Sequence, residues 1–144
     1  MSTSPPTHAP VEQFPIVEGC LQVGGIPLTQ LAMRVGQTPF YAYDRQLITN
    51  RIHHLRSHLP ADLRLHYAVK ANPMPAVVQH LATLVDGFDL ASLGEMRVAL
   101  DTTMPARHVS IAGPGKTDKE LRSAIAAGIA LNMESEGEMA RITD

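Results

Sequence analysis

The sequence is poor in cysteine, in aromatic residues and in net charge, and it has no long apolar run. Its 144 residues include one cysteine, Cys20, three Phe, three Tyr and no Trp. A single cysteine cannot form an internal disulfide, which fits the reducing cytoplasm. A formal net charge of −2 gives no electrostatic reason to expect nucleic acid or an anionic membrane as a partner. No uncharged apolar run approaches the ~20 residues of a membrane span, and the first residues lack the apolar core of a signal peptide. We therefore expect a soluble, cytoplasmic protein.

The first 44 residues predict a short segment that contains β-structure. Residues 1–13 are rich in Pro, Ser and Thr, and we expect a loose tail there. Beyond them, the pattern predicts a strand at 21–25 that ends in a Gly-Gly turn, a short helix at 27–34 and a second strand at 38–43. Asp44 is suited to be the N-cap of the helix that follows.

From residue 45 onward, helical and extended patterns alternate. After a helix at 45–58, we expect strands at 63–70, 87–91, 108–112 and 129–134, with helices at 76–84, 93–100, 118–127 and from 136. Three helix starts carry the capping-box pattern: Ser92 with Glu95, Thr117 with Glu120, and Ser135 with Glu138. Strands separated by single helices are typical of parallel βαβ units.

Within these strands, bulky apolar residues alternate with small or polar ones. Phe88 and Leu90 would lie on one face and Asp89 on the other, and Leu131 and Met133 would likewise pack beneath helices. An open doubly wound sheet needs large apolar residues on both faces, whereas a barrel that opens on a site needs them on one. The sequence therefore predicts an α/β fold: the N-terminal half of a (β/α)8 TIM-type barrel at 45–144, preceded by the segment at 1–44. Four of the eight strands are present.

Lys70 is the first candidate for chemistry, because the stretch HYAVKANP (66–73) places it where a strand gives way to a helix. In an extended strand, Ala68 and Lys70 share one face, and Asn72 and Pro73 suit the N-cap and first position of the next helix. An amine in a barrel mouth can attack a carbonyl group, as a Schiff-base lysine does. A lysine at a strand end can also simply extend its ammonium group into solvent. Both interpretations stay open at this point.

The same alternation places other polar residues near Lys70. Asp89 should face inward at the same height on the next strand, where it could pair with the lysine or bind loop backbone. Glu95 is explained by its capping box alone, while Asn132 and Glu134 would also face inward. The loop GPGK (113–116) lacks the full P-loop spacing and is first of all a turn. The histidines do not fall in metal-ligand spacing with Cys or acidic residues, so no metal site is predicted.

Four ordered motifs resemble those of a known family. YAVKANP (67–73) is similar to the lysine motif of the fold-type III pyridoxal-phosphate-dependent decarboxylases, the group of diaminopimelate, ornithine and arginine decarboxylases. FDLASLGE (88–95), AGPGKT (112–117) and NMESE (132–136) resemble the next three in order and spacing. LQVGGIPL (21–28) and TPFYAYD (38–44) resemble diaminopimelate decarboxylase-like members. Within the group, the chain looks most like the exosortase-associated pyridoxal-dependent decarboxylases.

The resemblance implies an alanine racemase-like barrel with pyridoxal 5′-phosphate as its cofactor. Lys70 would hold the cofactor as a Schiff base, and Ala68 would pack against its ring. Asp89 would lie beside the lysine and the cofactor, and Glu95 and Lys116 would be outer neighbours at most. The implied reaction is decarboxylation of an amino acid, diaminopimelate-like or related, in a homodimer whose active site is shared by both subunits.

Family members complete the barrel and add a β domain that would pair with the segment at 1–44. We therefore expect this chain to be the N-terminal part of a larger enzyme and to be inactive alone. An amino-acid racemase of the same barrel type is an alternative, disfavoured because the second to fourth motifs match the decarboxylases. A non-catalytic fragment that complements a separately encoded second half is another alternative. The substrate and its stereocentre are not specified by these residues.

Overall fold

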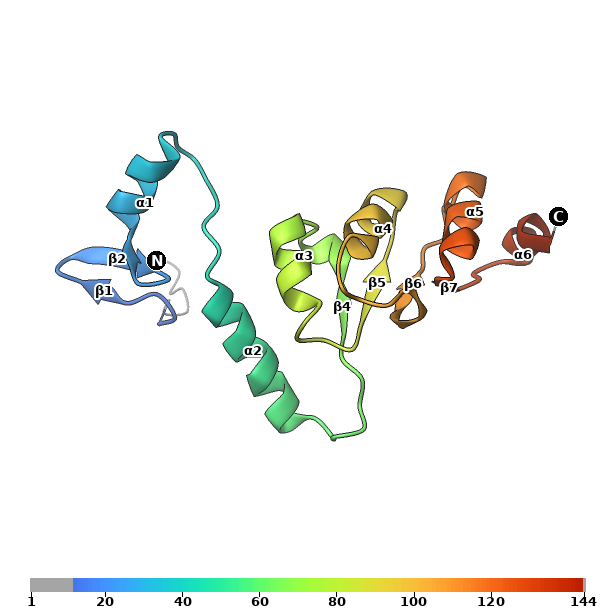
Figure 1. Cartoon of the computed structure of the whole chain (residues 1–144), viewed down its shortest axis with the longest axis horizontal. Coiled ribbons are helices and arrows are strands. Elements are labelled where there is room, and N and C mark those ends of the chain that lie inside the picture. The colour runs from blue at the N-terminus through green and yellow to red at the C-terminus, as the bar shows by residue number, and fades with distance from the viewer. Residues whose placement is uncertain (1–11, 144) are drawn as a thin grey trace, which may run out of the picture. The chain divides into compact units, whose positions relative to one another are not determined.

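The computed structural model describes residues 12–143, and the chain divides into two compact units. The first unit ends at Arg51 and the second begins at Ile52, so the division falls within helix α2 (Arg45–His58). Each unit has a sheet of its own (Figure 1). The domain boundary expected after Asp44 stays a prediction.

The first unit contains a three-stranded antiparallel sheet and one helix. Its strands are β1 (Ile16–Val17), β2 (Cys20–Val23) and β3 (Ile26–Pro27), in the order β1-β2-β3, and α1 (Leu28–Val35) follows. Both hairpins turn through two residues with positive φ, Glu18-Gly19 and Gly24-Gly25. Such turns match the twist of antiparallel strands, and glycine reaches positive φ without a steric penalty. The strand, the Gly-Gly turn and the helix predicted here are confirmed with small shifts in their bounds.

The second strand expected at 38–43 is wrong, because residues 36–44 form neither helix nor strand. β2 is already paired on both sides, so it offers no free edge to this stretch. Pro39 also lacks the N–H group that a strand ladder requires. Tyr41 in this stretch is 89% exposed.

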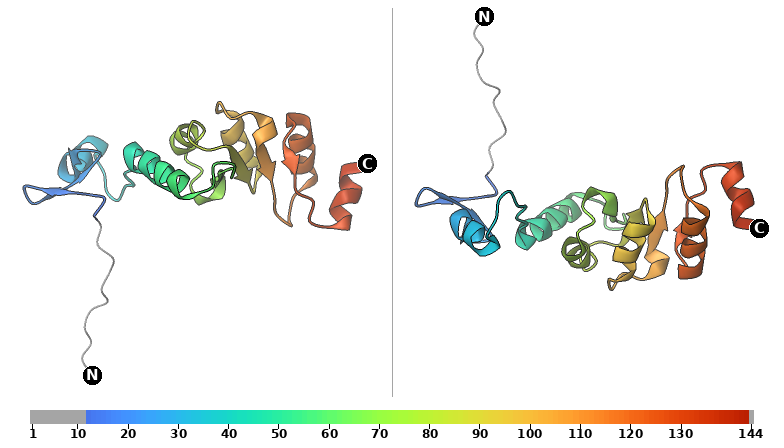
Figure 2. Two further views of the ribbon diagram at one scale, coloured as in Figure 1. Left: turned by 90° about the horizontal axis from the view of Figure 1, so that it is seen from below. Right: turned by 90° about the horizontal axis from the view of Figure 1, so that it is seen from above.

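The second unit contains a four-stranded parallel sheet whose strands alternate with helices. The strands are β4 (His66–Ala68), β5 (Gly87–Leu90), β6 (Val109–Ile111) and β7 (Ala130–Leu131), in the order β4-β5-β6-β7. The helices are α3 (Pro75–Leu81), α4 (Leu93–Leu100), α5 (Asp118–Ala127) and α6 (Glu136–Thr143), and single 3-10 turns span Val69–Ala71 and Ala106–His108. The turned views show strands and helices following one another in chain order (Figure 2). The expected strand–helix alternation is confirmed.

The core of this unit lies between one face of the sheet and the helices α3, α4 and α5 (Figure 1). On that face, Phe88, Leu90, Val109 and Ile111 are at most 2% exposed. The helices add buried apolar side chains: Val77, Val78 and Leu81 from α3, Met96 and Ala99 from α4, and Leu121 and Ala124 from α5. Burial of one large apolar side chain contributes about 1.5–3 kcal/mol, so the packing of this face stabilises the unit.

The strand next to the candidate lysine is shorter than the expected 63–70. β4 ends at Ala68, and Lys70 lies in the 3-10 turn that follows it. The strand expected at 129–134 is also too long, because β7 ends at Leu131. Met133, which was expected to pack beneath helices, is therefore outside the pleat and 56% exposed.

The helix after Lys70 begins one residue before the expected range of 76–84, but two residues after Pro73, which was expected to occupy its first position. Met74 is its N-cap and Pro75 occupies the first turn, so the capping role of Asn72 and the helical position of Pro73 are both wrong. A residue that precedes proline avoids helical backbone angles. The Oδ1 atom of Asn72 instead accepts the N–H of Met74 at 3.1 Å, which closes a turn of its own.

The predicted helix starts differ in how completely they form capping boxes. Thr117 and Glu120 form the full reciprocal box. Ser92 and Ser135 each accept the N–H of the glutamate three residues later. A full box also requires that glutamate to accept the N–H of the serine. Here each glutamate instead accepts the N–H of the residue before the serine. Asp44 caps α2 as expected, because its Oδ1 accepts the Gln46 N–H at 2.7 Å.

Candidate active site

The candidate site lies on the sheet face opposite the core and includes Lys70, which follows the carboxyl end of β4. Strand register places Ala68, Asp89, Ser110 and Ala130 in one row across β4 to β7. All four side chains are small or polar, and none is buried. In parallel α/β proteins, ligands bind at this edge of the sheet.

Lys70 lies in the turn that directly follows β4. Val69 anchors this turn because it is 0% exposed, and the Tyr67 hydroxyl donates to the Asn72 carbonyl at 3.2 Å. Lys70 itself is exposed, and its amine forms no hydrogen bond or ion pair with any residue between 12 and 143. An exposed amine on an anchored turn is suited to attack a carbonyl group.

Asp89 is paired differently from the sequence expectation. It lies in register with Ala68, two residues before Lys70, so the two charged groups are not at the same height. Its Oδ1 accepts a short hydrogen bond from the Ser110 hydroxyl and lies 3.4 Å from His66 Nδ1. The structure thus brings Asp89 together with His66 and Ser110, while its predicted role beside the lysine and cofactor stays a prediction.

The other two predicted site residues have distinct surroundings. The sheet face opposite the core is called the inner face below. Ala68 is half-buried in the row of side chains on this face, where its methyl group leaves space above the sheet. Glu95 accepts the Ala91 N–H at 2.9 Å and the Ser92 hydroxyl at 3.2 Å. Those contacts occupy its carboxylate at the start of α4, as its capping pattern suggested.

The loop at 113–116 is held by side chains on both sides of Gly113. The Gly113 N–H donates to Glu134 Oε1 at 2.6 Å, and the Gly113 carbonyl accepts from Lys116 Nζ at 2.6 Å. Because the Gly113 N–H already has this acceptor, turn chemistry describes the loop better than a phosphate cradle does.

A buried ion pair that sequence reasoning missed joins this loop to α6. Lys116 Nζ lies 3.1 Å from Glu138 Oε1, and the two side chains are 2% and 3% exposed. The same Nζ donates to the Asn132 carbonyl at 2.9 Å. The Glu134 N–H donates to Glu138 Oε2 and lowers the pKa of that carboxyl; burial opposes this shift, and Lys116 adds to it. Glu138 could have pointed to this ion pair in the sequence, but its place in the capping-box pattern with Ser135 already accounted for its carboxylate.

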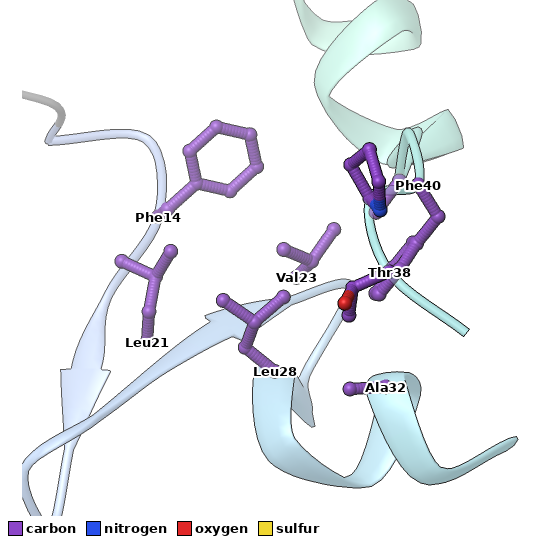
Figure 3. Close-up of a pocket in the computed structure, with 9 residues that line it drawn as sticks. Phe14, Leu21, Val23, Leu28, Ala32, Thr38 and Phe40 are labelled. Atoms are coloured by element: carbon purple, nitrogen blue, oxygen red, sulfur yellow. The ribbon is translucent and has the colours of Figure 1, made fainter. Parts of the chain in front are cut away.

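The first unit has an apolar hollow of about 470 Å³ and no candidate for chemistry in it (Figure 3). Its lining is formed by side chains of the hairpins, α1 and the stretch after it: Phe14, Leu21, Val23, Leu28, Ala32, Thr38, Pro39, Phe40 and Ala42.

Across the described part of the chain, no three His, Cys, Asp or Glu side chains are grouped to hold a metal ion. Over the same residues, none of the helices has the length and apolarity needed to cross a bilayer.

The second unit is a parallel βα sheet with a lysine in the turn after its first strand, and comparison with known proteins identifies the family. Residues 45–144 match the family described as "Pyridoxal-dependent decarboxylase, pyridoxal binding domain". The chain belongs to this family, as the four motifs indicated. The pyridoxal cofactor that the resemblance implied is thereby confirmed.

Individual relatives agree with this assignment. The chain is 37% identical over 103 residues to the 2-[(L-alanin-3-ylcarbamoyl)methyl]-2-hydroxybutanedioate decarboxylase of Staphylococcus aureus, covering 71% of this chain and 26% of that protein. It is 38% identical over 123 residues to the diaminopimelate decarboxylase of Aquifex aeolicus, covering 85% and 29%. The crystal structure of diaminopimelate decarboxylase from M. jannaschii with L-lysine has a TM-score of 0.77 at 29% identity, covering 90% and 31%. The predicted fold class is confirmed, and the chain spans about a quarter to a third of these proteins.

The inner face of the sheet fits a flat pyridoxal ring. Ala68 and Ala130 expose only methyl groups along the row, and Lys70 offers an amine without a partner among residues 12–143. Asp89 supplies a carboxylate on the same face, and 49% of its side chain is exposed. These residues would suit the attachment of an aldehyde-bearing cofactor to Lys70.

Proposed function

We propose that this chain supplies the cofactor-lysine part of a pyridoxal-phosphate-dependent amino-acid decarboxylase. The observation that carries the proposal is the exposed amine of Lys70, which lies on an anchored turn at the carboxyl edge of a parallel sheet. The inner face beside it consists of small and polar side chains in one row. When bound, pyridoxal phosphate supplies the electron sink that accepts the electrons of the broken carbon–carboxylate bond.

Each predicted residue has a proposed part in this site. The Lys70 amine binds the cofactor, and the small Ala68 side chain allows a ring to approach the sheet. The Asp89 carboxylate stabilises positive charge on the lysine or the cofactor. Glu95 fixes the start of α4 through its hydrogen bonds to Ala91 and Ser92, so its contribution is through the backbone.

We also propose a substrate and an assembly for this enzyme. The substrate is an amino acid, diaminopimelate-like or related, and the enzyme is of the exosortase-associated type. The assembly is a cytoplasmic homodimer with shared active sites. Because the described sheet has four strands and a closed barrel of this type has eight, we expect little or no decarboxylation by these 144 residues alone.

Covalent trapping tests the role of Lys70 directly. Pyridoxal phosphate is added to the purified chain, borohydride converts lysine-bound pyridoxal into a stable secondary amine, and mass spectrometry finds the modified lysine. The chain contains three lysines, Lys70, Lys116 and Lys119, so the assignment is unambiguous. We expect modification at Lys70 that Lys70→Ala abolishes and that Lys119→Ala, an exposed control, leaves intact.

A wild-type chain whose Lys70 is modified no faster than the exposed Lys119 would contradict the proposal. Robust release of carbon dioxide from an amino acid by the isolated 144 residues would instead contradict the expected inactivity, because it would show that four strands suffice.

A further inference from the structure

We propose that His66 and Ser110 are positioning residues that hold the Asp89 carboxylate by one oxygen and leave the other for the cationic group of the site. The inference rests on the proposed function of Lys70, because it needs a cofactor or lysine cation for Asp89 to face. Neither His66 nor Ser110 belongs to the motifs that pointed to the family.

The two residues reach Asp89 from opposite sides. Ser110 is the register partner of Asp89 on β6, and its hydroxyl donates to Asp89 Oδ1. His66 comes from β4, and its Nδ1 lies 3.4 Å from the same oxygen. No residue among those described forms a hydrogen bond or an ion pair with Oδ2. One carboxylate oxygen therefore accepts a hydrogen bond from Ser110 on one side and lies 3.4 Å from the His66 ring on the other, where a protonated imidazole would pair with it, and the second oxygen is available.

Gly87 provides the space that this arrangement needs. It is the register partner of His66 and lies on the inner face, two residues before Asp89. A Cβ atom built on Gly87 would lie 2.6 Å from His66 Cε1 and 2.8 Å from His66 Nε2. The imidazole thus lies close to the bare backbone of Gly87, and from there its Nδ1 approaches Asp89.

The physical benefit is a carboxylate with a fixed direction. The Asp89 side chain is 49% exposed, and an exposed aspartate without partners would rotate among several conformers. Two partners on one oxygen select a single conformer before any ligand arrives. A charge that is already oriented stabilises a cation without the cost of rearrangement.

The first readout uses the cofactor-free chain, so it does not depend on the function of Lys70. The ¹³C signal of the Asp89 carboxyl carbon, assigned by its loss in Asp89→Asn, is recorded in variants of its neighbours. We expect Ser110→Ala and His66→Phe to shift this signal, Ser110→Thr to restore it, and Lys119→Ala, at an exposed position on α5, to leave it in place. An Asp89 signal that ignores both Ser110→Ala and His66→Phe would overturn the proposal.

The second readout is the rate of borohydride trapping of pyridoxal at Lys70. Loss of one ordinary hydrogen bond changes an equilibrium constant or a rate by about five-fold. Ser110→Ala should therefore slow trapping by about that factor, and Ser110→Thr should restore the wild-type rate. An unchanged rate in Ser110→Ala would also contradict the positioning role. If the wild-type chain is not trapped at Lys70 at all, the proposed function fails, while the carbon signal still decides whether His66 and Ser110 position Asp89.

Discussion

The substitution Gly87→Ala tests the close approach on the inner face of the sheet. Gly87 is buried, and its added Cβ would collide with the His108 carbonyl oxygen and lie 2.6 Å from the His66 ring. The ring can swing away, but the carbonyl belongs to the 3-10 turn that leads into β6 and cannot move alone. Overpacking of this kind costs about 1–3 kcal/mol. In a domain of 60–100 residues each 1 kcal/mol corresponds to about 4–8 °C, so the melting temperature should fall by at least about 4 °C.

Gly137→Ala is the matched control for this measurement. Gly137 lies in the first turn of α6 and is exposed, and a Cβ added to it would meet no atom within 4 Å. Alanine there restricts the unfolded chain and should stabilise the protein by about 0.4–1 kcal/mol. Thermal and urea unfolding followed by circular dichroism would give both values. The reasoning is refuted if Gly87→Ala is neutral, or if it stabilises the chain as Gly137→Ala does.

Two further predictions concern the buried ion pair between the 113–116 loop and α6. Lys116→Met should lower the melting temperature by at least about 12 °C, because it leaves a buried carboxylate without its cation. Lys119→Met, on the exposed side of α5, should change it little, and equal melting temperatures for the two variants would contradict a stabilising pair. The folded state lowers the pKa of Glu138 below its ordinary 4.5, so its contribution is present above that pH and is lost as the pH falls through the folded value. Urea unfolding across this acid range should therefore show a loss of stability that Glu138→Gln reduces, and an identical pH profile for the variant would exclude Glu138 as its source.

The sequence predicted helices better than strand ends, for a physical reason. The helices at 45–58, 93–100 and 118–127 have the predicted bounds, because their start signals are local: Asp44, Ser92 and Thr117 each accept an N–H within three residues. Strand ends depend on what the neighbouring strand offers. β4 and β7 are at the two ends of the sheet order, and both are shorter than their extended patterns.

The candidate site was predictable in its residues and less so in its contacts. Lys70 and Asp89 could be located because the lysine turn and the alternation of Phe88, Asp89 and Leu90 are local features. Their relative height could not, because it depends on the parallel register of β4 and β5, which pairs Asp89 with Ala68. The ion pair of Lys116 and Glu138 spans 22 positions and needs the loop and α6 to meet, which no local pattern encodes.

The alternation of the strands separates the stability of the second unit from its chemistry. Phe88 and Val109 are 0% and 1% exposed beneath the helices, while their sequence neighbours Asp89 and Ser110 lie on the opposite face. Substitutions at Ser110 and Lys70 therefore remove little buried area, and surface changes of this kind usually alter stability by less than about 0.5 kcal/mol. A slower reaction of Lys70 in Ser110→Ala could then be attributed to the site, because the core that supports it would be unchanged.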